Sequence, residues 1–435
     1  MHPRKFYPAL LALLAVLGAP RAFAELQIDI TKGVTDPIPI AVVQFARAVP
    51  ADGGLDVAAV VQRDLESSGR FKGMQRRDML SQPTRAGEVQ TADWRTARND
   101  FIVVGRVSAP SANELVIDFD LMNLLTGQTL LSQNVRVVPN SLRYGAHRVA
   151  DIIYERITGT RGAFATRIMY VSVDGAPPKQ NYQLLVADSD GENMRRVLQS
   201  DRPIMSPAWS PDGQWFAYVS FEQDISSVWL QNARTAERRR ISARAGVNGS
   251  PSFSPDGKKI ALTLSGSSGN LDIYMLDLAS QQLTRVTDDP AIDTEATWSP
   301  DGKYLYFMSD RGGAPQIYRA EARERGPAKR ITFNVGQAMR PRLSPDGTQL
   351  LMITREGGGD KVAVMDLANN QTRTLTRGSL DESPSFAPNG AQIIYAGRDR
   401  GLGALATVSI DGQVTLRLKS DQGEVRDPVW GPFGN

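Results

Sequence analysis

Short runs of alternating hydrophobic and polar residues recur over the C-terminal two thirds of the chain. The first of them, residues 215–219 (Trp-Phe-Ala-Tyr-Val), follows a Ser-Pro-Asp-Gly turn at 210–213. In such a turn proline presets φ, aspartate bonds to the nearby backbone and glycine accepts a positive φ. Alternation with a period of two between turn residues predicts a β-strand. Strands are expected on both sides of each turn, and third and fourth runs follow, so each repeat predicts four strands.

The turn motif recurs at a nearly constant period of 43–45 residues. The apolar residues that precede the six turns are Trp209, Phe253, Trp298, Leu343, Phe386 and Trp430. Four short strands in about 45 residues are typical of one blade of a β-propeller. The sequence therefore predicts six blades within residues 168–435.

The sixth copy of the motif lies within a few residues of the C-terminal Asn435 and leaves no room for the other strands of its blade. Matching runs occur at the start of the repeat region, at 168–173, 183–187 and 194–198. We therefore expect the C-terminal strand, placed at 428–433, to pair with the first strand of the region. This closure removes the sheet edges that an open array would expose.

The first 24 residues have the pattern of a secretory signal peptide. Arg4 and Lys5 form a basic start, residues 9–18 are apolar, and residues 22–24 (Ala-Phe-Ala) resemble a cleavage site. We expect cleavage before Glu25 and export of a soluble chain.

Residues 25–160 lack the repeat and predict a small α/β domain, joined to the propeller by a linker at 161–167. Strands are expected at 26–31, 38–45 and 101–107, and a hairpin at 115–138. A helix is expected at 55–68. A second helix begins at the cap Ser141 and ends at Gly159. The whole chain is thus an α+β multi-domain protein.

Charge and cysteine content exclude several classes of function. The chain has 50 basic and 47 acidic residues, and three of the basic ones lie in the signal peptide, so the remainder is balanced. The sequence contains no block of basic residues that would predict nucleic-acid binding. There is no cysteine, which excludes disulfides, a thiolate nucleophile and a cysteine-based metal site.

Candidate catalytic and metal-binding residues are few. His147 is the one histidine after the signal peptide, and it is expected to be a surface or packing residue of its helix. No Gly-x-Ser-x-Gly nucleophile elbow occurs. The pairs 288–289 (Asp-Asp) and 381–382 (Asp-Glu) offer oxygen ligands but no regular ligand spacing, so we interpret them as solvated turns. We expect no enzyme activity and no cofactor, with a calcium ion in the propeller channel as an open alternative.

The segments that lead into the innermost strands are the best candidates for a binding surface. We expect them to be loops around one mouth of the channel. They differ from blade to blade while the turn motif stays constant, which suits recognition of an asymmetric partner. The candidate residues are Met205, Val247, Asn248, Ser250, Thr294, Glu295, Met339, Arg340, Glu382 and Arg426.

The order of these parts resembles the TolB family of the Tol–Pal system, which is periplasmic in Gram-negative bacteria. The segment 39–45 (Pro-Ile-Ala-Val-Val-Gln-Phe) is similar to a family segment that usually has proline where Gln44 stands. The resemblance covers the whole chain after the signal peptide. It implies a monomeric, non-enzymatic adaptor that supports outer-membrane integrity and constriction during cell division.

The resemblance also implies partners and sites. The mouth would bind Pal, the peptidoglycan-associated lipoprotein, through the candidate residues above, although Val247 stands where the family often has histidine. Other outer-membrane proteins and bacteriocins are further possible partners. The first mature residues would bind TolA, and this segment consists of Glu25, Leu26, Gln27, Ile28, Asp29, Ile30, Thr31, Lys32 and Gly33.

Two alternatives from other classes stay open at this point. A secreted peptidase of the prolyl-oligopeptidase type would need a hydrolase domain, for which residues 25–160 are too few. A propeller that binds a small ligand, such as a sugar or a quinone, has no specific support in the sequence.

Overall fold

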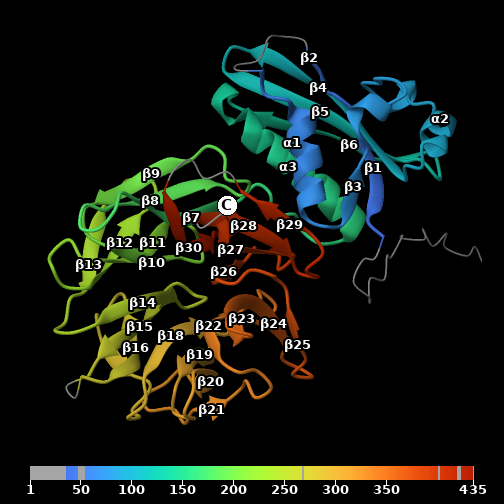
Figure 1. Cartoon of the computed structure of the whole chain (residues 1–435). Coiled ribbons are helices and arrows are strands. Elements are labelled where there is room, and N and C mark those ends of the chain that lie inside the picture. Colours follow the sequence, from blue (N-terminus) through green and yellow to red (C-terminus); the bar gives the residue numbers. More distant parts are fainter. Residues whose placement is uncertain (1–35, 48–53, 267–268, 400–401, 419–422, 435) are drawn as a thin grey trace, which may run out of the picture. The chain divides into compact units, whose positions relative to one another are not determined.

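The structure, a computed structural model, describes residues 36–47, 54–266, 269–399, 402–418 and 423–434. These residues form one mixed sheet with three α-helices, followed by six four-stranded sheets arranged around a centre (Figure 1). The predicted fold class is confirmed. The predicted signal peptide, the segment 25–33 and the strand at 26–31 lie outside the described residues. In the described part of the chain, no helix has the length and apolar character needed to cross a bilayer.

The N-terminal sheet has the strand order β3-β1-β4-β5-β6, with β2 beside β4. Strand β1 is parallel to β3 and β4, while β4, β5 and β6 form an antiparallel meander. The bounds are β1 (Ile38–Val42), β2 (Ala46–Arg47), β3 (Phe71–Gly73), β4 (Phe101–Ser111), β5 (Glu114–Asn123), β6 (Gln128–Val137), α1 (Val57–Ser67), α2 (Thr91–Thr96) and α3 (Leu142–Thr158).

Both faces of this sheet are covered, as the continuous apolar run in β1 requires. Ile40 and Val42 face the core formed with α1 and α3. Ala41 and Val43 belong to a second core that includes Trp94 of α2. All four residues of this strand region are fully buried, so alternation along β1 decides which helix each side chain meets.

The predicted end of the second helix at Gly159 is confirmed, whereas the first helix is Val57–Ser67 and not 55–68. The carboxylate of Asp56 caps α1 by accepting the N–H of Ala59 at 3.0 Å. Helix α3 ends at Gly159, which has φ 73°. The predicted cap Ser141 makes no side-chain capping bond, so this prediction was wrong. Ser141 belongs to a 3₁₀ turn and has φ −113° and ψ 18°, away from the extended geometry of a capping residue.

Each propeller blade is an antiparallel sheet whose strands follow one another from the centre outwards (Figure 1). Blade one contains β10 (Ile204–Trp209), β11 (Trp215–Ser220), β12 (Ser227–Asn232) and β13 (Arg238–Ser242). Blade two contains β14 (Asn248–Phe253), β15 (Lys259–Ser265), β16 (Leu271–Asp277) and β17 (Leu283–Arg285). Blade three contains β18 (Asp293–Trp298), β19 (Tyr304–Ser309), β20 (Gln316–Glu321) and β21 (Lys329–Arg330).

The remaining blades repeat this order, except that blade six begins with the last strand of the chain. Blade four contains β22 (Ala338–Leu343), β23 (Gln349–Glu356), β24 (Gly359–Asp366) and β25 (Thr372–Thr374). Blade five contains β26 (Glu382–Phe386), β27 (Gln392–Asp399), β28 (Leu402–Ser409) and β29 (Thr415–Arg417). Blade six contains β30 (Glu424–Trp430), β7 (Arg167–Asp174), β8 (Asn181–Asp188) and β9 (Arg195–Ser200).

The ring closes as predicted, because β30 pairs with β7 in antiparallel register, Trp430 opposite Ile168. The predicted bounds of the closing strand, 428–433, were wrong. The strand starts four residues earlier and crosses Pro428 through a register shift between Arg426 and Val429. Proline has no N–H for the ladder, so it suggested a strand start where the structure has a bulge.

The Ser-Pro-Asp-Gly turns have the expected chemistry. In blade two, the hydroxyl of Ser254 donates to Asp256 at 2.6 Å and accepts the N–H of Lys259 at 2.9 Å. Gly257 has φ 69°. The same three features recur in blade three, with Gly302 at φ 70°. Repetition in several blades supports a structural role for this serine–aspartate pair.

Candidate functional site

The segments predicted as mouth loops are the first halves of the innermost strands. Residues 204–206, 248–250, 293–295 and 338–340 lie in β10, β14, β18 and β22. The expectation of loops was therefore wrong for most of these residues. Each innermost strand contains a register shift in its pairing, for example between Met205 and Ala208 in β10. The bulge turns a local group of side chains toward the channel without ending the strand.

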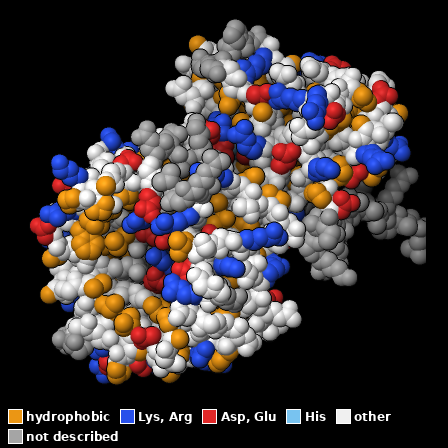
Figure 2. Space-filling model, viewed as in Figure 1, with side chains coloured by type: hydrophobic (Ala, Val, Ile, Leu, Met, Phe, Trp, Pro, Cys, Tyr) orange, Lys and Arg blue, Asp and Glu red, His pale blue; other side chains and the backbone are white. Residues whose placement is uncertain are grey.

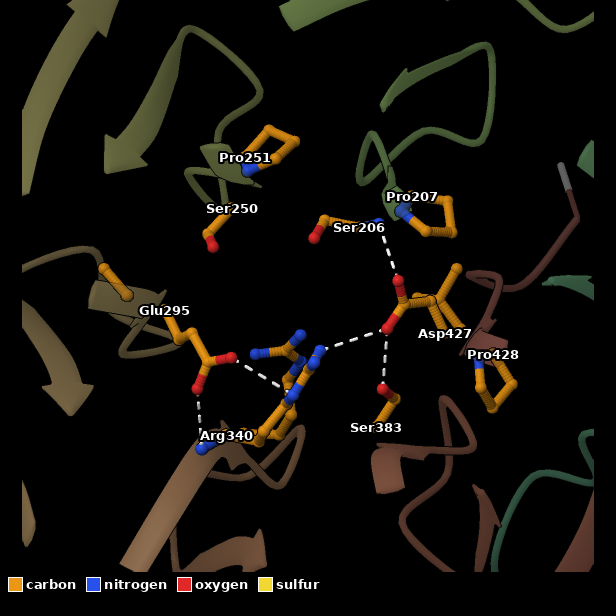
Figure 3. Close-up of a pocket in the computed structure, with 12 residues that line it drawn as sticks. Ser206, Pro207, Ser250, Pro251, Glu295, Arg340, Ser383, Asp427 and Pro428 are labelled. Carbon is orange, nitrogen blue, oxygen red and sulfur yellow. Dashed lines mark hydrogen bonds and ion pairs between the residues drawn. The ribbon is translucent and has the colours of Figure 1, made fainter. Parts of the chain in front are cut away.

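Six equivalent residues at these bulges have positive φ, between 46° and 59°. We call them the channel ring: Ser206, Ser250, Glu295, Arg340, Ser383 and Asp427. Figure 3 shows them around one hollow. Left-handed backbone costs a non-glycine residue roughly 1 kcal/mol, so its recurrence in all six blades indicates that the closed ring imposes this geometry. Three members, Ser206, Ser383 and Asp427, were not among the predicted site residues.

Arg340 joins three blades across the ring. Its Nη1 lies 3.1 Å from Oδ1 of Asp427 in blade six, and its Nε lies 3.1 Å from Oε1 of Glu295 in blade three. Its backbone N–H also donates to Glu295 at 3.1 Å. Figure 3 shows the guanidinium between the two carboxylates. The two acidic side chains are thereby neutralised in part and held apart.

Asp427 is the most strongly held acid of the channel ring. It accepts the backbone N–H of Ser206 at 3.0 Å and the hydroxyl of Ser383 at 2.7 Å. Burial would raise the pKa of Asp427, but Arg340 and these two donors outweigh burial and hold the pKa below its usual value. The carboxylate is therefore charged, and its bonds link blades one, four, five and six.

The hollow inside the ring is small, about 30 Å³. One buried water needs roughly 10–15 Å³ by the same measure, so the hollow holds very few water molecules. Arg342, two residues after Arg340 on β22, also lines this hollow. Burial lowers the pKa of Arg342, while Glu295 opposes this effect. The ring closes this part of the channel with paired charges and leaves no space for a sugar- or quinone-sized ligand.

Exposed hydrophobic side chains surround this mouth. In the described part of the propeller, all large hydrophobic residues that are exposed lie at this end of the blades. We call them the apolar rim: Met205, Ile225, Val247, Ile292, Phe333 and Leu380. Phe333 is the most exposed, at 62 %. Figure 2 shows acidic and basic side chains together at the centre of the propeller and hydrophobic ones over blades one and two.

Four members of the apolar rim were missed by the sequence analysis: Ile225, Ile292, Phe333 and Leu380. A signal for three of them exists. Ile225, Ile292 and Leu380 are large apolar residues isolated among turn residues, whereas Phe333 alternates with Ile331 and Val335. Exposed apolar residues that gather on one face indicate an interaction surface more strongly than scattered ones do.

The predicted site residues fall into exposed and structural groups. Met205, Val247 and Arg426 are exposed, whereas Asn248 is fully buried. The amide of Asn248 accepts from Ser242 at 2.6 Å and donates to the carbonyl of Arg244 at 2.7 Å. It shapes the turn that presents Val247.

The other predicted residues are half-buried near the ring. The hydroxyl of Thr294 lies 3.2 Å from that of Thr263, and Met339 packs on a core cluster of blades four and five. Burial raises the pKa of Glu382, and Asp427 raises it further. Ser250, Glu295 and Arg340 are members of the channel ring itself.

The acidic pairs considered for calcium are tied to arginines or buried. Asp288 lies 2.8 Å from Arg285, and Asp289 lies 3.5 Å from Arg311. Asp381 is buried, and burial raises its pKa. His147 is also buried, with 1 % of its side chain exposed. Packing was therefore the correct interpretation of His147, and a surface position was wrong.

Fold and site together define a propeller protein with a charged, closed centre and an exposed apolar rim. Comparison with known proteins gives the family. The family described as "TolB beta propeller domain" matches residues 154–434, and the "TolB amino-terminal domain" matches residues 26–130.

Relatives match over nearly the full length. The Tol-Pal system proteins TolB of Xanthomonas euvesicatoria pv. vesicatoria and Xanthomonas campestris pv. campestris are each 44 % identical, covering 99 % of this chain and 98 % of theirs. The crystal structure of TolB from Acinetobacter baumannii is 40 % identical and superposes with a TM-score of 0.84, covering 92 % of this chain and 97 % of that one. The chain belongs to the TolB family of the Tol-Pal system.

Proposed function

We propose that this chain is a non-enzymatic adaptor of the periplasm. It binds Pal at the propeller mouth and TolA through residues 25–33, and it supports outer-membrane integrity and constriction during cell division. The observation that carries the Pal assignment is the apolar rim around the channel ring. The TolA assignment rests on the family resemblance, because residues 25–33 lie outside the described residues.

The chemistry of the mouth supports protein binding over catalysis. The ring charges are paired with one another, and the central hollow is too small for a substrate. Interfaces between proteins combine a hydrophobic contact area with polar groups that fix register. The apolar rim supplies the hydrophobic contact area. Exposed Arg426, which donates to Glu424 at 2.8 Å, is suited to fix the register. An adaptor of this kind needs no cofactor.

The two binding sites are proposed to be coupled. Residues 25–33 would either pack on the body or be free for TolA, and Pal binding would favour one of these states. Two sites are coupled only where a ligand has different affinities for the two states. An unchanged affinity for Pal after deletion of residues 25–33 would remove the support for this coupling.

The adaptor function is tested by calorimetric titration of the purified protein with the soluble domain of its Pal. Val247→Asp and Ile292→Asp place a charge on the rim without touching the ion pairs of the ring. We expect each to weaken binding by at least about tenfold, because a charge in the contact area would be desolvated. Leu80→Asp is the matched control, since Leu80 is 60 % exposed on the N-terminal domain.

The outcomes separate the possibilities. Tight binding by wild type and Leu80→Asp, with loss in both rim variants, supports the proposal. Absence of binding by the folded wild type, or equal binding by all variants, would overturn Pal recognition at this mouth.

A further inference from the structure

A buried polar cluster joins helices α1 and α3 to the turn after β8, away from the propeller mouth. His147 on α3 lies between Asp64 on α1 and Asp190 in the turn. The side chains of His147, Asp64 and Asp190 are 1 %, 4 % and 11 % exposed. Charged and titratable groups are rarely buried to this extent without a specific partner. The proposed adaptor function does not use this cluster.

The two nitrogens of His147 have different surroundings. Nδ1 lies 2.7 Å from Oδ2 of Asp64, which is a normal hydrogen-bond distance. Nε2 is buried and has no hydrogen-bond partner. Its nearest acidic neighbour is Oδ2 of Asp190, at 3.7 Å. The imidazole is therefore oriented from one side and left unpartnered on the other.

We propose that Nε2 of His147 and a carboxylate oxygen of Asp190 bind a divalent transition-metal ion, with water from the adjoining hollow as the remaining ligands. Asp64 orients the imidazole through the other ring nitrogen, Nδ1. A histidine that ligates a metal usually donates its other N–H to a carboxylate, which fixes its tautomer and orientation. The contact between Asp64 and Nδ1 is of this kind.

The distance of 3.7 Å also suits a shared metal ion. Zinc lies about 2.0–2.1 Å from nitrogen and oxygen ligands, so two ligands of a tetrahedral ion are roughly 3.4 Å apart. One ligand atom each from Asp64, His147 and Asp190 lies within 4.8 Å of the others. The separation of Nε2 and Oδ2 is thus too long for a hydrogen bond and close to that of two ligands.

An adjoining hollow supplies access to the cluster and room for water ligands. Asp188 and His147 line the same hollow of about 410 Å³, which has room for water as a remaining ligand. Oδ2 of Asp188 accepts from Asn193 at 2.6 Å, which orients the carboxylate. Arg143 is paired with Oδ2 of Asp190, and Oδ1 of Asp190 accepts the N–H of Glu192 at 3.1 Å.

The charges of the cluster match a divalent cation. Asp64, Asp188 and Asp190 contribute three negative charges and Arg143 one positive charge, which leaves two negative charges when His147 is neutral. Imidazole and carboxylate ligands together favour zinc and related transition metals over calcium, which prefers oxygen. The neutral form of His147 is the metal-bound one: the metal displaces the Nε2 proton of the imidazolium, the Nδ1 proton stays, and one proton is released.

The chain allows an unambiguous test, because His147 is its one histidine outside the predicted signal peptide. Tag-free protein expressed as the full chain is labelled with ¹⁵N-histidine and treated with a chelator. Zn²⁺ is then titrated while the imidazole nitrogens are followed by NMR. We expect one equivalent to move the Nε2 resonance to that of a metal-bound nitrogen, while Nδ1 stays protonated. Ca²⁺ should leave both resonances unchanged.

Variants and controls place the ion. Asp190→Asn should weaken Zn²⁺ binding, and Asp64→Asn should weaken it by roughly 10–100-fold, as expected for the loss of an orienting carboxylate. Asp289→Asn is the matched control at a distant acidic turn and should bind as wild type does. An Nε2 that stays protonated in excess Zn²⁺ would overturn the proposal, and so would equal binding by Asp190→Asn. Neither result bears on the binding of Pal.

Discussion

Arg340 and Asp427, 87 residues apart in sequence, form an ion pair across the centre of the propeller with 3.1 Å between Nη1 and Oδ1. The pair joins blade four to the blade that contains the last strand of the chain. Because Arg340 also binds Glu295 of blade three, one side chain connects three blades at the place where the apolar rim surrounds the channel.

Replacement of Arg340 by Met should destabilise the protein by about 2 kcal/mol. Removal of one partner from a buried ion pair costs roughly 3–5 kcal/mol, because it leaves an uncompensated charge. The side chain of Arg340 is 31 % exposed, so we expect less than the full cost. Urea denaturation measures the change.

Arg355→Met is the matched control for this variant. Arg355 lies 2.7 Å from Asp360, but 52 % of its side chain is exposed. Pairs of this kind contribute about 0–1 kcal/mol. Equal losses in the two variants would show that the ring pair has no special structural role.

The closing strand depends on Trp430, and Trp430→Ala should cost about 3–5 kcal/mol. Its ring is 7 % exposed in a core shared by β7 and blade five. The indole N–H donates to Thr166 at 2.8 Å, and the backbone N–H donates to Ser385 at 3.0 Å. Chemical denaturation should show the loss, whereas Phe333→Ala, at an exposed aromatic residue, should change stability little.

Gly257→Ala tests the turn motif of the blades. At φ 69° an alanine is strained, and the added Cβ meets nothing closer than Pro211 Cδ at 3.7 Å. The expected cost is therefore about 1 kcal/mol from backbone conformation alone. Gly87→Ala is the control, since Gly87 has no positive φ and no atom within 4 Å of the added Cβ. A neutral Gly257→Ala would contradict the assigned turn geometry.

Asp151 should make stability fall as the pH rises from about 4 to 7. Burial raises its pKa to about 6, against the N–H groups of Phe164 and Ala165 that favour the charged form. The pKa of Asp151 in the unfolded state is 3.8, so between pH 3.8 and about 6 the folded state binds more protons than the unfolded state does. The contribution of Asp151 to the free energy of unfolding is fully present below pH 3.8. It is lost as the pH rises through 6, and the loss amounts to about 3 kcal/mol at most.

The comparison with Asp151→Asn isolates this group. Asparagine retains an acceptor for the N–H of Phe164, which lies 2.7 Å from the carboxylate, but it does not titrate. Thermal unfolding at several pH values should show wild type losing stability relative to the variant over this range. Parallel pH profiles would contradict the raised pKa.

The sequence by itself determined the repeat, the number of blades and the closure. Turn chemistry and period-two alternation are local properties, and each of the turns at Gly257 and Gly302 is specified by a few neighbouring residues. The missing strands of the last blade could be found at 168–198 because every blade needs the same four strands. The buried run around Ile40 and the hairpin of β5 and β6 were predicted for the same local reason.

Only the tertiary structure decided which side chains meet. Arg340, Glu295 and Asp427 come from three blades, and the bulges that turn them inward depend on pairing with the next strand. The segments that contain these residues were expected to be loops because the sequence does not show that each strand continues through its bulge. Likewise His147 and Asp64 are 83 residues apart, and helix periodicity gives the face of each residue but not its partner. Local patterns specify strands and turns, whereas long-range contacts are specified by the closure of the ring and by packing.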